Sequence, residues 1–157
     1  MQPIYTCLWF DDQALEAASF YVSVFPNSRI LDIKYYLEGA PQPAGSVLTV
    51  LFELNGVAHL ALNGGPIFQF SPAISLVADC NTQQEIDDLW RRLSEGGKEG
   101  QCGWLTDRFG VSWQIVPGAL HALIDGADAA ASQRAFSALM KMTKLDIAAL
   151  RRAYEKN

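Results

Sequence analysis

The side chains of this chain that could do acid–base, nucleophilic or metal chemistry are few and far apart in the sequence. There are two histidines, His59 shortly after an Asn55-Gly56 pair and His121 in the last quarter of the chain. Imidazole titrates near neutral pH and binds metals, but two histidines cannot build a three-histidine site from one chain. We therefore expect each histidine to be a hydrogen-bonded structural residue.

The three cysteines, Cys7, Cys80 and Cys102, could serve as nucleophiles or form bonds to metals. Their number is odd and they lack the Cys-x-x-Cys spacing of zinc sites, so we predict reduced thiols in a cytoplasmic protein. Cys102 lies close to two glycines and is predicted to be the most accessible. Either Cys102 or Cys7 would need a neighbouring base to act as a nucleophile, and the sequence places no histidine beside them.

Gln114 is the most informative polar residue, because it interrupts an otherwise apolar run. It lies in "CGWLTDRFGVSWQIVPG", residues 102–118, where a polar turn at 107–110 separates two apolar segments that each contain a tryptophan. A buried amide without a partner costs roughly 1–3 kcal/mol. Gln114 is therefore either a hydrogen-bonding group inside a pocket or a tie between neighbouring strands. The tryptophans have two interpretations as well, pocket wall or core packing; they are Trp9, Trp104 and Trp113.

Several function classes are disfavoured by what the sequence lacks. There is no Gly-x-Gly-x-x-Gly, no phosphate-binding P-loop and no Gly-x-Ser-x-Gly, so nucleotide cofactors and a serine-hydrolase site are not indicated. The net charge of −5 argues against nucleic-acid binding. No apolar run approaches the roughly 18 residues that span a bilayer, and no leader pattern opens the chain, which favours a cytoplasmic protein without membrane contact.

One basic cluster near the C-terminus departs from the acidic average. We interpret it as a solvated helix face; its members are Lys141, Lys144, Arg151, Arg152 and Lys156.

The elements that must position these residues fall into a repeated pattern. A strand at 4–10 precedes a helix at 12–25, whose N-terminus we expect Asp11-Asp12 to cap. Strands follow at 28–37 and 46–54, and the Asn55-Gly56 pair predicts a hairpin into a further strand, VAHLALN. The order strand, helix, strand, strand, strand describes a βαβββ module.

The pattern then begins again. A strand at 74–80 leads to an amphipathic helix at 82–97, capped by Asn81 or Thr82, and two strands flank the turn at 107–110. A period of about 65 residues is long for a solenoid and suits two fused modules. We predict an α+β protein with two βαβββ modules, at 1–65 and 66–118, that form cupped mixed sheets.

A helical extension is predicted for 119–157. Asp128 and Asp146 are expected to cap two of its helices. Its methionines, Met140 and Met142, are expected to make packing contacts rather than to form a cofactor site.

The whole arrangement resembles the vicinal oxygen chelate superfamily of glyoxalases, extradiol dioxygenases and bleomycin-resistance proteins, and within it the PhnB-like group, whose members often carry the label demethylubiquinone methyltransferase. The residues that carry the resemblance cover nearly the whole chain. They are "CLWFDDQALEAASFYVSVFPNSRI" (7–30), "HLALNGGP" (59–66), "AISLVADCNTQQEIDDLWRRLSEGG" (73–97), "CGWLTDRFGVSWQIVPG" (102–118) and "ALMKMTKLDIAAL" (138–150).

The resemblance implies where metal ligands would lie in this chain. Metal-binding relatives place a carboxylate four residues after the hairpin glycine, a position held here by Gln114. The four ligand positions read Thr6, Leu60, Pro72 or Ala73, and Gln114. Divalent ions need several oxygen or nitrogen donors, so this set predicts no metal. His59 is one residue out of register, which in a strand turns it to the other face.

The resemblance then favours a metal-free protein that binds a small molecule, as bleomycin-resistance proteins do, with no cofactor. The predicted ligand-binding residues are Thr6, Leu8, Leu60, Cys102, Trp104 and Gln114. The alternative is a metal-dependent enzyme of the glyoxalase or dioxygenase type. A methyltransferase is disfavoured because no glycine-rich strand-loop-helix for the methyl donor is present. The resemblance also implies a homodimer, and whether any reaction is catalysed stays open.

Overall fold

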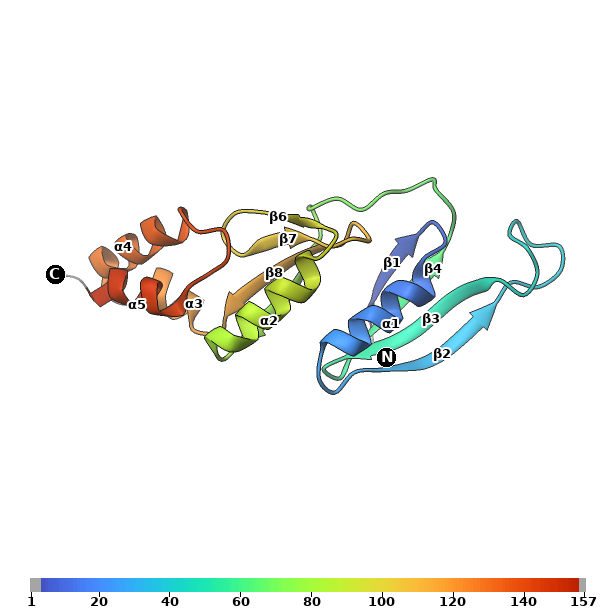
Figure 1. The fold of residues 1–157 in the computed structure, drawn as a ribbon, viewed down its shortest axis with the longest axis horizontal. Coiled ribbons are helices and arrows are strands. Elements are labelled where there is room, and N and C mark those ends of the chain that lie inside the picture. Colours follow the sequence, from blue (N-terminus) through green and yellow to red (C-terminus); the bar gives the residue numbers. More distant parts are fainter. Residues whose placement is uncertain (1–3, 156–157) are drawn as a thin grey trace. The chain divides into compact units, whose positions relative to one another are not determined.

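The structure is a computed structural model, and it describes residues 4–155. The chain divides between Phe70 and Ser71 into two compact units (Figure 1). The first contains β1 (Thr6–Phe10), α1 (Ala14–Val24), β2 (Arg29–Tyr35), β3 (Val47–Leu54) and β4 (Val57–Asn63). The second contains β5 (Leu76–Cys80), α2 (Gln83–Ser94), β6 (Lys98–Glu99), β7 (Trp104–Thr106), β8 (Ser112–Pro117), α3 (Leu120–Ile124), α4 (Ala129–Leu139) and α5 (Ile147–Glu155).

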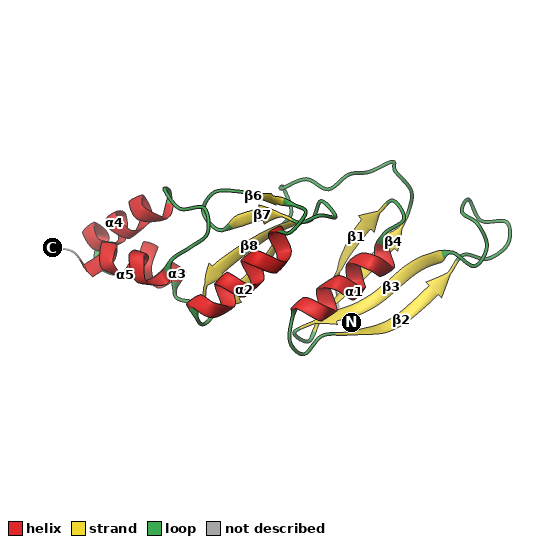
Figure 2. Ribbon diagram, in the orientation of Figure 1, coloured by secondary structure: helices red, strands yellow, loops and turns green. Residues whose placement is uncertain are grey.

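The predicted fold class is confirmed, because each unit repeats the same strand order. The sheets run β1-β4-β3-β2 and β5-β8-β7-β6, and both are mixed (Figure 2). In each, the first strand pairs in parallel with the last strand of its module, while the remaining neighbours are antiparallel. The result is an α+β protein with two βαβββ modules and a C-terminal helical extension.

In the first unit, α1 covers one face of the sheet. Tyr21 of α1 stacks on Phe52 of β3 with ring centroids 6.3 Å apart, and both side chains are fully buried. The expected cap by Asp11-Asp12 is wrong. Helix α1 begins at Ala14, and the Ala14 amide donates to Oδ1 of Asn63 at 2.8 Å. A side chain from β4 thus satisfies a helix end that the sequence assigns to its nearest acids.

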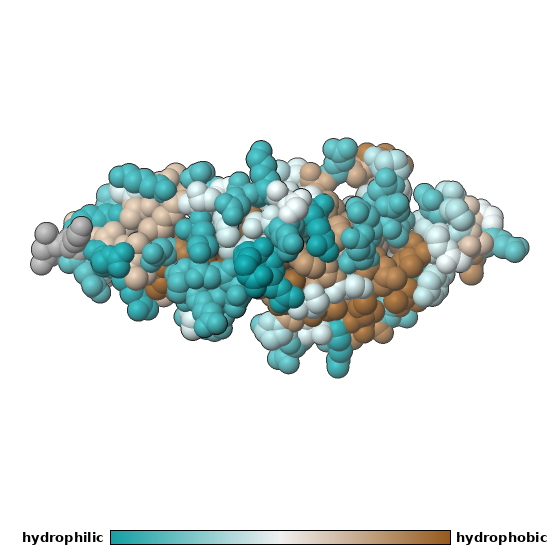
Figure 3. Space-filling view, in the orientation of Figure 1, coloured by the Kyte–Doolittle hydropathy of each residue, from teal (hydrophilic) through white to brown (hydrophobic). Residues whose placement is uncertain are grey.

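In the second unit, α2 packs on one face of the β5-β8-β7-β6 sheet through Ile86, Trp90 and Leu93. Its N-terminus carries a reciprocal capping box, so Thr82 rather than Asn81 is the cap. The Glu85 amide donates to the Thr82 hydroxyl at 3.2 Å, and a Glu85 carboxylate oxygen accepts from the Thr82 amide at 3.4 Å. The outward side of α2 is hydrophilic in the space-filling view (Figure 3).

The turn at 107–110 is organised by one buried carboxylate. Asp107 is 3% exposed and accepts hydrogen bonds from the Phe109 amide at 2.8 Å, the Val111 amide at 3.0 Å and the Trp113 indole at 2.8 Å. Gly110 takes a φ of +89°, a conformation that costs glycine little. The turn therefore joins β7 to β8 through side-chain as well as backbone bonds.

The helical extension folds onto the second unit. Asp128 and Asp146 cap α4 and α5 as expected, accepting from the amides of Ala131 and Ala149. Val116 of β8 joins a buried cluster with three leucines of the extension, Leu139, Leu145 and Leu150. Met142 packs against this cluster as expected, whereas Met140 is 54% exposed.

Polar bonds fasten the same segment to the sheet and to α2. The Cys102 and Gly103 amides donate to the carbonyls of Met142 and Thr143, each at 2.8 Å. Gln83, at the start of α2, donates to the Leu145 carbonyl and accepts from the Ile147 amide. The extension is therefore an integral part of the second unit.

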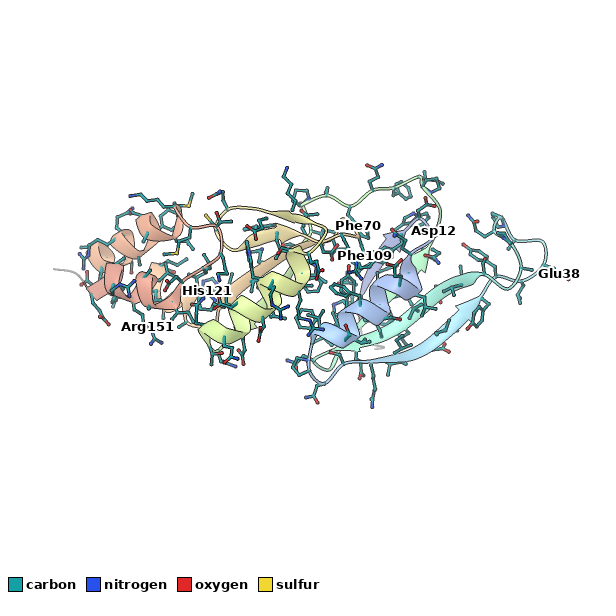
Figure 4. All side chains as sticks on the ribbon, viewed as in Figure 1. Asp12, Glu38, Phe70, Phe109, His121 and Arg151 are labelled. Carbon is teal, nitrogen blue, oxygen red and sulfur yellow. The ribbon has the colours of Figure 1, made fainter. Side chains whose placement is uncertain are left out.

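The basic residues of the extension lie at its surface within residues 4–155, while Lys156 falls outside the described residues. Figure 4 shows Arg151 on α5. Lys144 forms an ion pair with Asp87, and the hydrogen bonds from Lys144 and then Gln83 lower the pKa of that carboxyl. In the part of the chain that the structure describes, no helix is long and apolar enough to cross a bilayer.

Candidate functional site

The face of the second sheet that lies opposite α2 carries an aromatic, an aliphatic and an amide side chain in one row. Gln114 of β8 is directly paired with Val77 of β5 on one side and with Trp104 of β7 on the other. Side chains alternate between faces along a strand, so Trp113 and Ile115 turn the other way and are buried beneath α2. We call the row of Val77, Gln114 and Trp104 the amide face.

Gln114 ties neighbouring strands together, which is one of the two roles that the sequence left open to it, and it keeps one acceptor unbonded among the described residues. Its side-chain amide nitrogen donates to the Ser75 hydroxyl at 2.9 Å, which ties β8 to the residue just before β5. Its Oε1 accepts no hydrogen bond from any described residue, and the Trp104 indole N–H donates none within residues 4–155. A half-buried acceptor and a half-buried donor therefore remain side by side for a ligand or water.

The helical extension borders this face at one end. Val116 lies two residues beyond Gln114 on the same side of β8, and it is buried in the cluster with Leu139, Leu145 and Leu150. The amide face is consequently open along Val77, which is 56% exposed, and closed where β8 meets the extension.

The solvent exposure of the three cysteines differs from the prediction. Cys7 is the exposed thiol, whereas Cys102 is only partly exposed and packs beside the leucine cluster, so the prediction for Cys102 is wrong. Partial burial of the Cys7 sulfur raises its pKa. Burial, then the charges of Glu85 and Asp79, raises the pKa of Cys80 to about 11. Neither Cys7 nor Cys80 is thus an activated nucleophile at neutral pH.

The six residues predicted to bind a ligand do not gather in one place. Trp104 and Gln114 are adjacent on the amide face, and Cys102 lies just before β7 beside the extension. In the first unit Leu60 pairs with Cys7 on the face away from α1. Thr6 and Leu8 pair with His59 and Ala61. Because His59 and Ala61 flank Leu60 along β4, all four side chains point to the opposite face, which α1 covers.

Two neighbours of Gln114 were missed in the sequence. Both Val77 and Ser75 lie in the strand that the sequence predicts at 74–80, but no sequence signal indicates that they are neighbours of Gln114. Only the register between β5 and β8 makes that assignment, because strand pairing depends on partners 37 to 39 residues apart along the chain. The tryptophans also differ in burial: Trp113 is a core residue, whereas Trp9 and Trp104 are half-buried.

His59 is a core residue, as expected. It is 7% exposed, stacks on Phe52 with centroids 5.5 Å apart, and its Nδ1 lies 2.9 Å from the Val57 carbonyl. Desolvation lowers the pKa of His59, and the hydrogen bond to Val57, which raises it, offsets only part of that effect. His121 is exposed at the start of α3, in the other unit (Figure 4).

The lowered pKa of His59 predicts a pH-dependent stability. The unfolded histidine protonates near pH 6.5 while the buried imidazole stays neutral to lower pH, so the unfolded state binds more protons in that window. We expect the free energy of unfolding to fall as the pH drops through about 6.5, and His59→Phe to flatten this dependence. Urea titrations at several pH values measure both. An unchanged slope in His59→Phe would contradict the assignment; His121→Asn, at an exposed position, is the matched control.

The donors on the two sheet faces do not fit a divalent metal. Beside the neutral amide oxygen of Gln114, the second sheet offers the Asp79 carboxylate two residues beyond Val77. The corresponding face of the first unit offers the Cys7 thiol beside Leu60 and the Asp32 carboxylate opposite Leu51. Hard divalent ions prefer several oxygen or nitrogen ligands with anionic charge. Among residues 4–155, no group of three or more histidine, cysteine, aspartate and glutamate side chains could hold a metal ion.

Comparisons with known proteins bear on the same two modules. The model of the family described as 3-demethylubiquinone-9 3-methyltransferase matches residues 2–116. A structure of a PhnB protein from Bacillus cereus, described by the same activity, is 36% identical with a TM-score of 0.68, covering 73% of this chain and 99% of that one. A search of curated proteins returned no match.

Two more distant structures share the fold. Protein PA1353 from Pseudomonas aeruginosa is 21% identical, with a TM-score of 0.61 over 74% of this chain and 98% of that one. The fosfomycin resistance protein FosX from Listeria monocytogenes, solved with Mn(II) and sulfate, is 13% identical, with a TM-score of 0.53 over 73% and 89%. With the match over 2–116 and the 36% identity to the PhnB protein, the chain belongs to the 3-demethylubiquinone-9 3-methyltransferase family, in the PhnB-like group of the vicinal oxygen chelate superfamily.

Proposed function

We propose that this protein binds a small, partly aromatic molecule on the amide face of its second module without a metal ion. The observation that carries the proposal is the direct pairing of Gln114 with Val77 and Trp104, with the amide oxygen and the indole N–H both left unbonded among the described residues. Small-molecule sites are typically apolar surfaces with a few placed polar groups. The amide face has this composition on a rigid sheet.

The chemistry of the face defines the ligand class. The Trp104 ring and Val77 offer apolar contact, Oε1 of Gln114 accepts a hydrogen bond, and the Trp104 indole donates one. Asp79 lies two residues beyond Val77 on the same side of β5 and is exposed, which disfavours anions. The best match is a flat, neutral or weakly basic molecule with a donor and an acceptor on one edge. A homodimer, as the family resemblance implies, remains part of this proposal.

Two other activities are less well supported. A metal-dependent glyoxalase- or dioxygenase-type reaction needs a ligand set that the two sheet faces do not offer. The methyl transfer in the family's name needs a bound methyl donor such as S-adenosylmethionine. The turns after β1 and β5 carry Asp11-Asp12-Gln13 and Asn81-Thr82, with none of the glycines that let a backbone approach a nucleotide. These residues do not fit that cofactor.

The test uses aromatic probes and one substitution. Indole-3-carboxamide, salicylamide and 2-naphthol are titrated while intrinsic tryptophan fluorescence is followed. We expect saturable binding by at least one probe and an affinity loss of roughly tenfold in Gln114→Leu, because a desolvated hydrogen-bonding partner is worth about 1–3 kcal/mol.

The matched control is Gln133→Leu, which removes an amide from an exposed position on α4 and should leave the affinity unchanged. Equal affinity in wild type and Gln114→Leu, or no binding by any probe, would contradict the proposal. Binding that requires added Mn(II) would favour the metal-dependent alternative.

A further inference from the structure

Two sulfur atoms meet at the junction between the second sheet and the helical extension. Sγ of Cys102 lies 3.8 Å from Sδ of Met140 and 3.6 Å from the carbonyl oxygen of Leu139. Met140 is 54% exposed and Cys102 is partly exposed, so solvent reaches the pair. None of these atoms belongs to the amide face.

The backbone holds both sulfur-bearing residues in place. The Cys102 amide donates to the Met142 carbonyl at 2.8 Å, and Gly103 makes the equivalent bond to Thr143. Met140 follows the last residue of α4, and its own amide donates to the Phe136 carbonyl at 3.0 Å. The two sulfurs therefore face each other from segments that the fold has already ordered.

We propose that Cys102 and Met140 form a binding site for a soft monovalent cation of the Cu(I) class. Thiolate and thioether ligands select Cu(I) over hard divalent ions. Two sulfurs each about 2.3 Å from one ion are about 3.8 Å apart when the angle at the ion is near 110°, the angle of an ion with three or four ligands, so solvent or an added ligand completes the coordination. That is the separation present, so an ion enters between them with little movement of either side chain.

The surroundings also favour a cation over a neutral guest. The C-terminal end of α4 carries a partial negative charge, and the Leu139 carbonyl, which accepts from the Met142 amide at 3.0 Å, lies 3.6 Å from the thiol sulfur. Binding exchanges the thiol proton for the ion: the S–H bond breaks, the S–Cu bond forms and the proton goes to water. The oxidation state of copper does not change, so no oxidant or reductant is required.

The chain contains its own comparison groups for this site. Cys7 is an exposed thiol in the other unit, on the face that it shares with Leu60. Its affinity for Cu(I) is the reference value for a single accessible thiol. Met142 lies two residues from Met140 and packs against the leucine cluster. Substituting it therefore shows the effect of removing a nearby thioether that is not part of the Cys102–Met140 pair. Cys80 is buried and is retained in every variant.

The experiment is an anaerobic Cu(I) titration in competition with bathocuproine disulfonate. Its variants are Cys7→Ser, which leaves the proposed site, and Cys102→Ser, which leaves Cys7. Met140→Leu and Met142→Leu are made in the Cys7→Ser background. We expect one Cu(I) per chain in Cys7→Ser, bound at least tenfold more tightly than in Cys102→Ser. Met140→Leu should lose at least tenfold in affinity and Met142→Leu should lose little.

Leucine for methionine conserves volume, so Met140→Leu should fold as the parent does, and circular dichroism checks this. X-ray absorption at the copper edge supplies a second readout, with two sulfur neighbours expected in Cys7→Ser and one in the Met140→Leu variant. Equal affinities of the Cys7 and Cys102 sites, or an unchanged affinity in Met140→Leu, would overturn the proposal and leave only binding by an isolated thiol.

Discussion

Replacing Asp107 with alanine is expected to lower the free energy of unfolding by about 4 kcal/mol or more, since hydrogen bonds to a charged group contribute about 1.5–3 kcal/mol each and buried donors left unpaired add a penalty. The carboxylate is 3% exposed and accepts from the Phe109 and Val111 amides and the Trp113 indole. Alanine leaves all three donors without that partner, in the turn that joins β7 to β8.

Urea denaturation measures this loss. Asp88→Ala is the matched control, because Asp88 is an exposed aspartate of the same unit whose ion pair with Arg91 spans 3.5 Å; it should change stability by less than about 1 kcal/mol. A second variant, Asp107→Asn, keeps one acceptor oxygen and should lie between wild type and alanine. A stability of Asp107→Ala within about 1 kcal/mol of wild type, on the scale of the control, would show that the turn does not depend on the carboxylate.

Leu145→Ala is expected to destabilise the protein by about 3 kcal/mol, because truncating a buried leucine costs about 2–5 kcal/mol when the surroundings cannot collapse around the cavity. Leu145 has no exposed surface and packs with Val116, Leu139 and Leu150. Its side chain also lies close against Gly103, where a β-carbon in place of the glycine hydrogen would be only 3.1 Å from it. The cavity therefore opens where the extension meets the sheet.

Hydrogen exchange distinguishes local from global loosening in this variant. The Cys102 and Gly103 amides donate to Met142 and Thr143, so they should lose protection in Leu145→Ala more than amides of the first unit do. Leu37→Ala, at a residue that is 79% exposed, is the control and should change neither stability nor exchange. If Cys102 and Gly103 stay fully protected in Leu145→Ala, the extension is held independently of the leucine cluster.

The sequence was informative wherever the signal is local. The Asn55-Gly56 pair predicts the hairpin that joins β3 to β4, because a tight turn needs residues that tolerate positive φ, and both residues have one. Thr82 with Glu85, Asp128 and Asp146 predict helix starts, because a cap bonds an amide within the next few residues. The repeated order of these local signals was enough to predict two βαβββ modules.

The candidate site depended on contacts that no local signal encodes. Gln114 stood out in the sequence as a polar residue in an apolar strand, but its neighbours Val77 and Trp104 follow from the pairing of β8 with β5 and β7. Thr6 and Leu8 were predicted to bind ligand beside Leu60. A one-residue difference in strand position places them on the α1 side, since alternate residues point to opposite faces.

By itself, therefore, the sequence determined most of the elements, their order and the approximate positions of their ends, because turn propensity, capping and hydrophobic period act over a few residues. The superfamily followed from the resemblance of these segments to a known family. The tertiary structure alone decided which side chains share a face, that Asn63 rather than Asp12 closes the end of α1, and that Cys102 meets Met140. The Asn63 and Cys102 contacts join residues 49 and 38 positions apart, and their energies exist only once strand register and helix packing have brought the partners together.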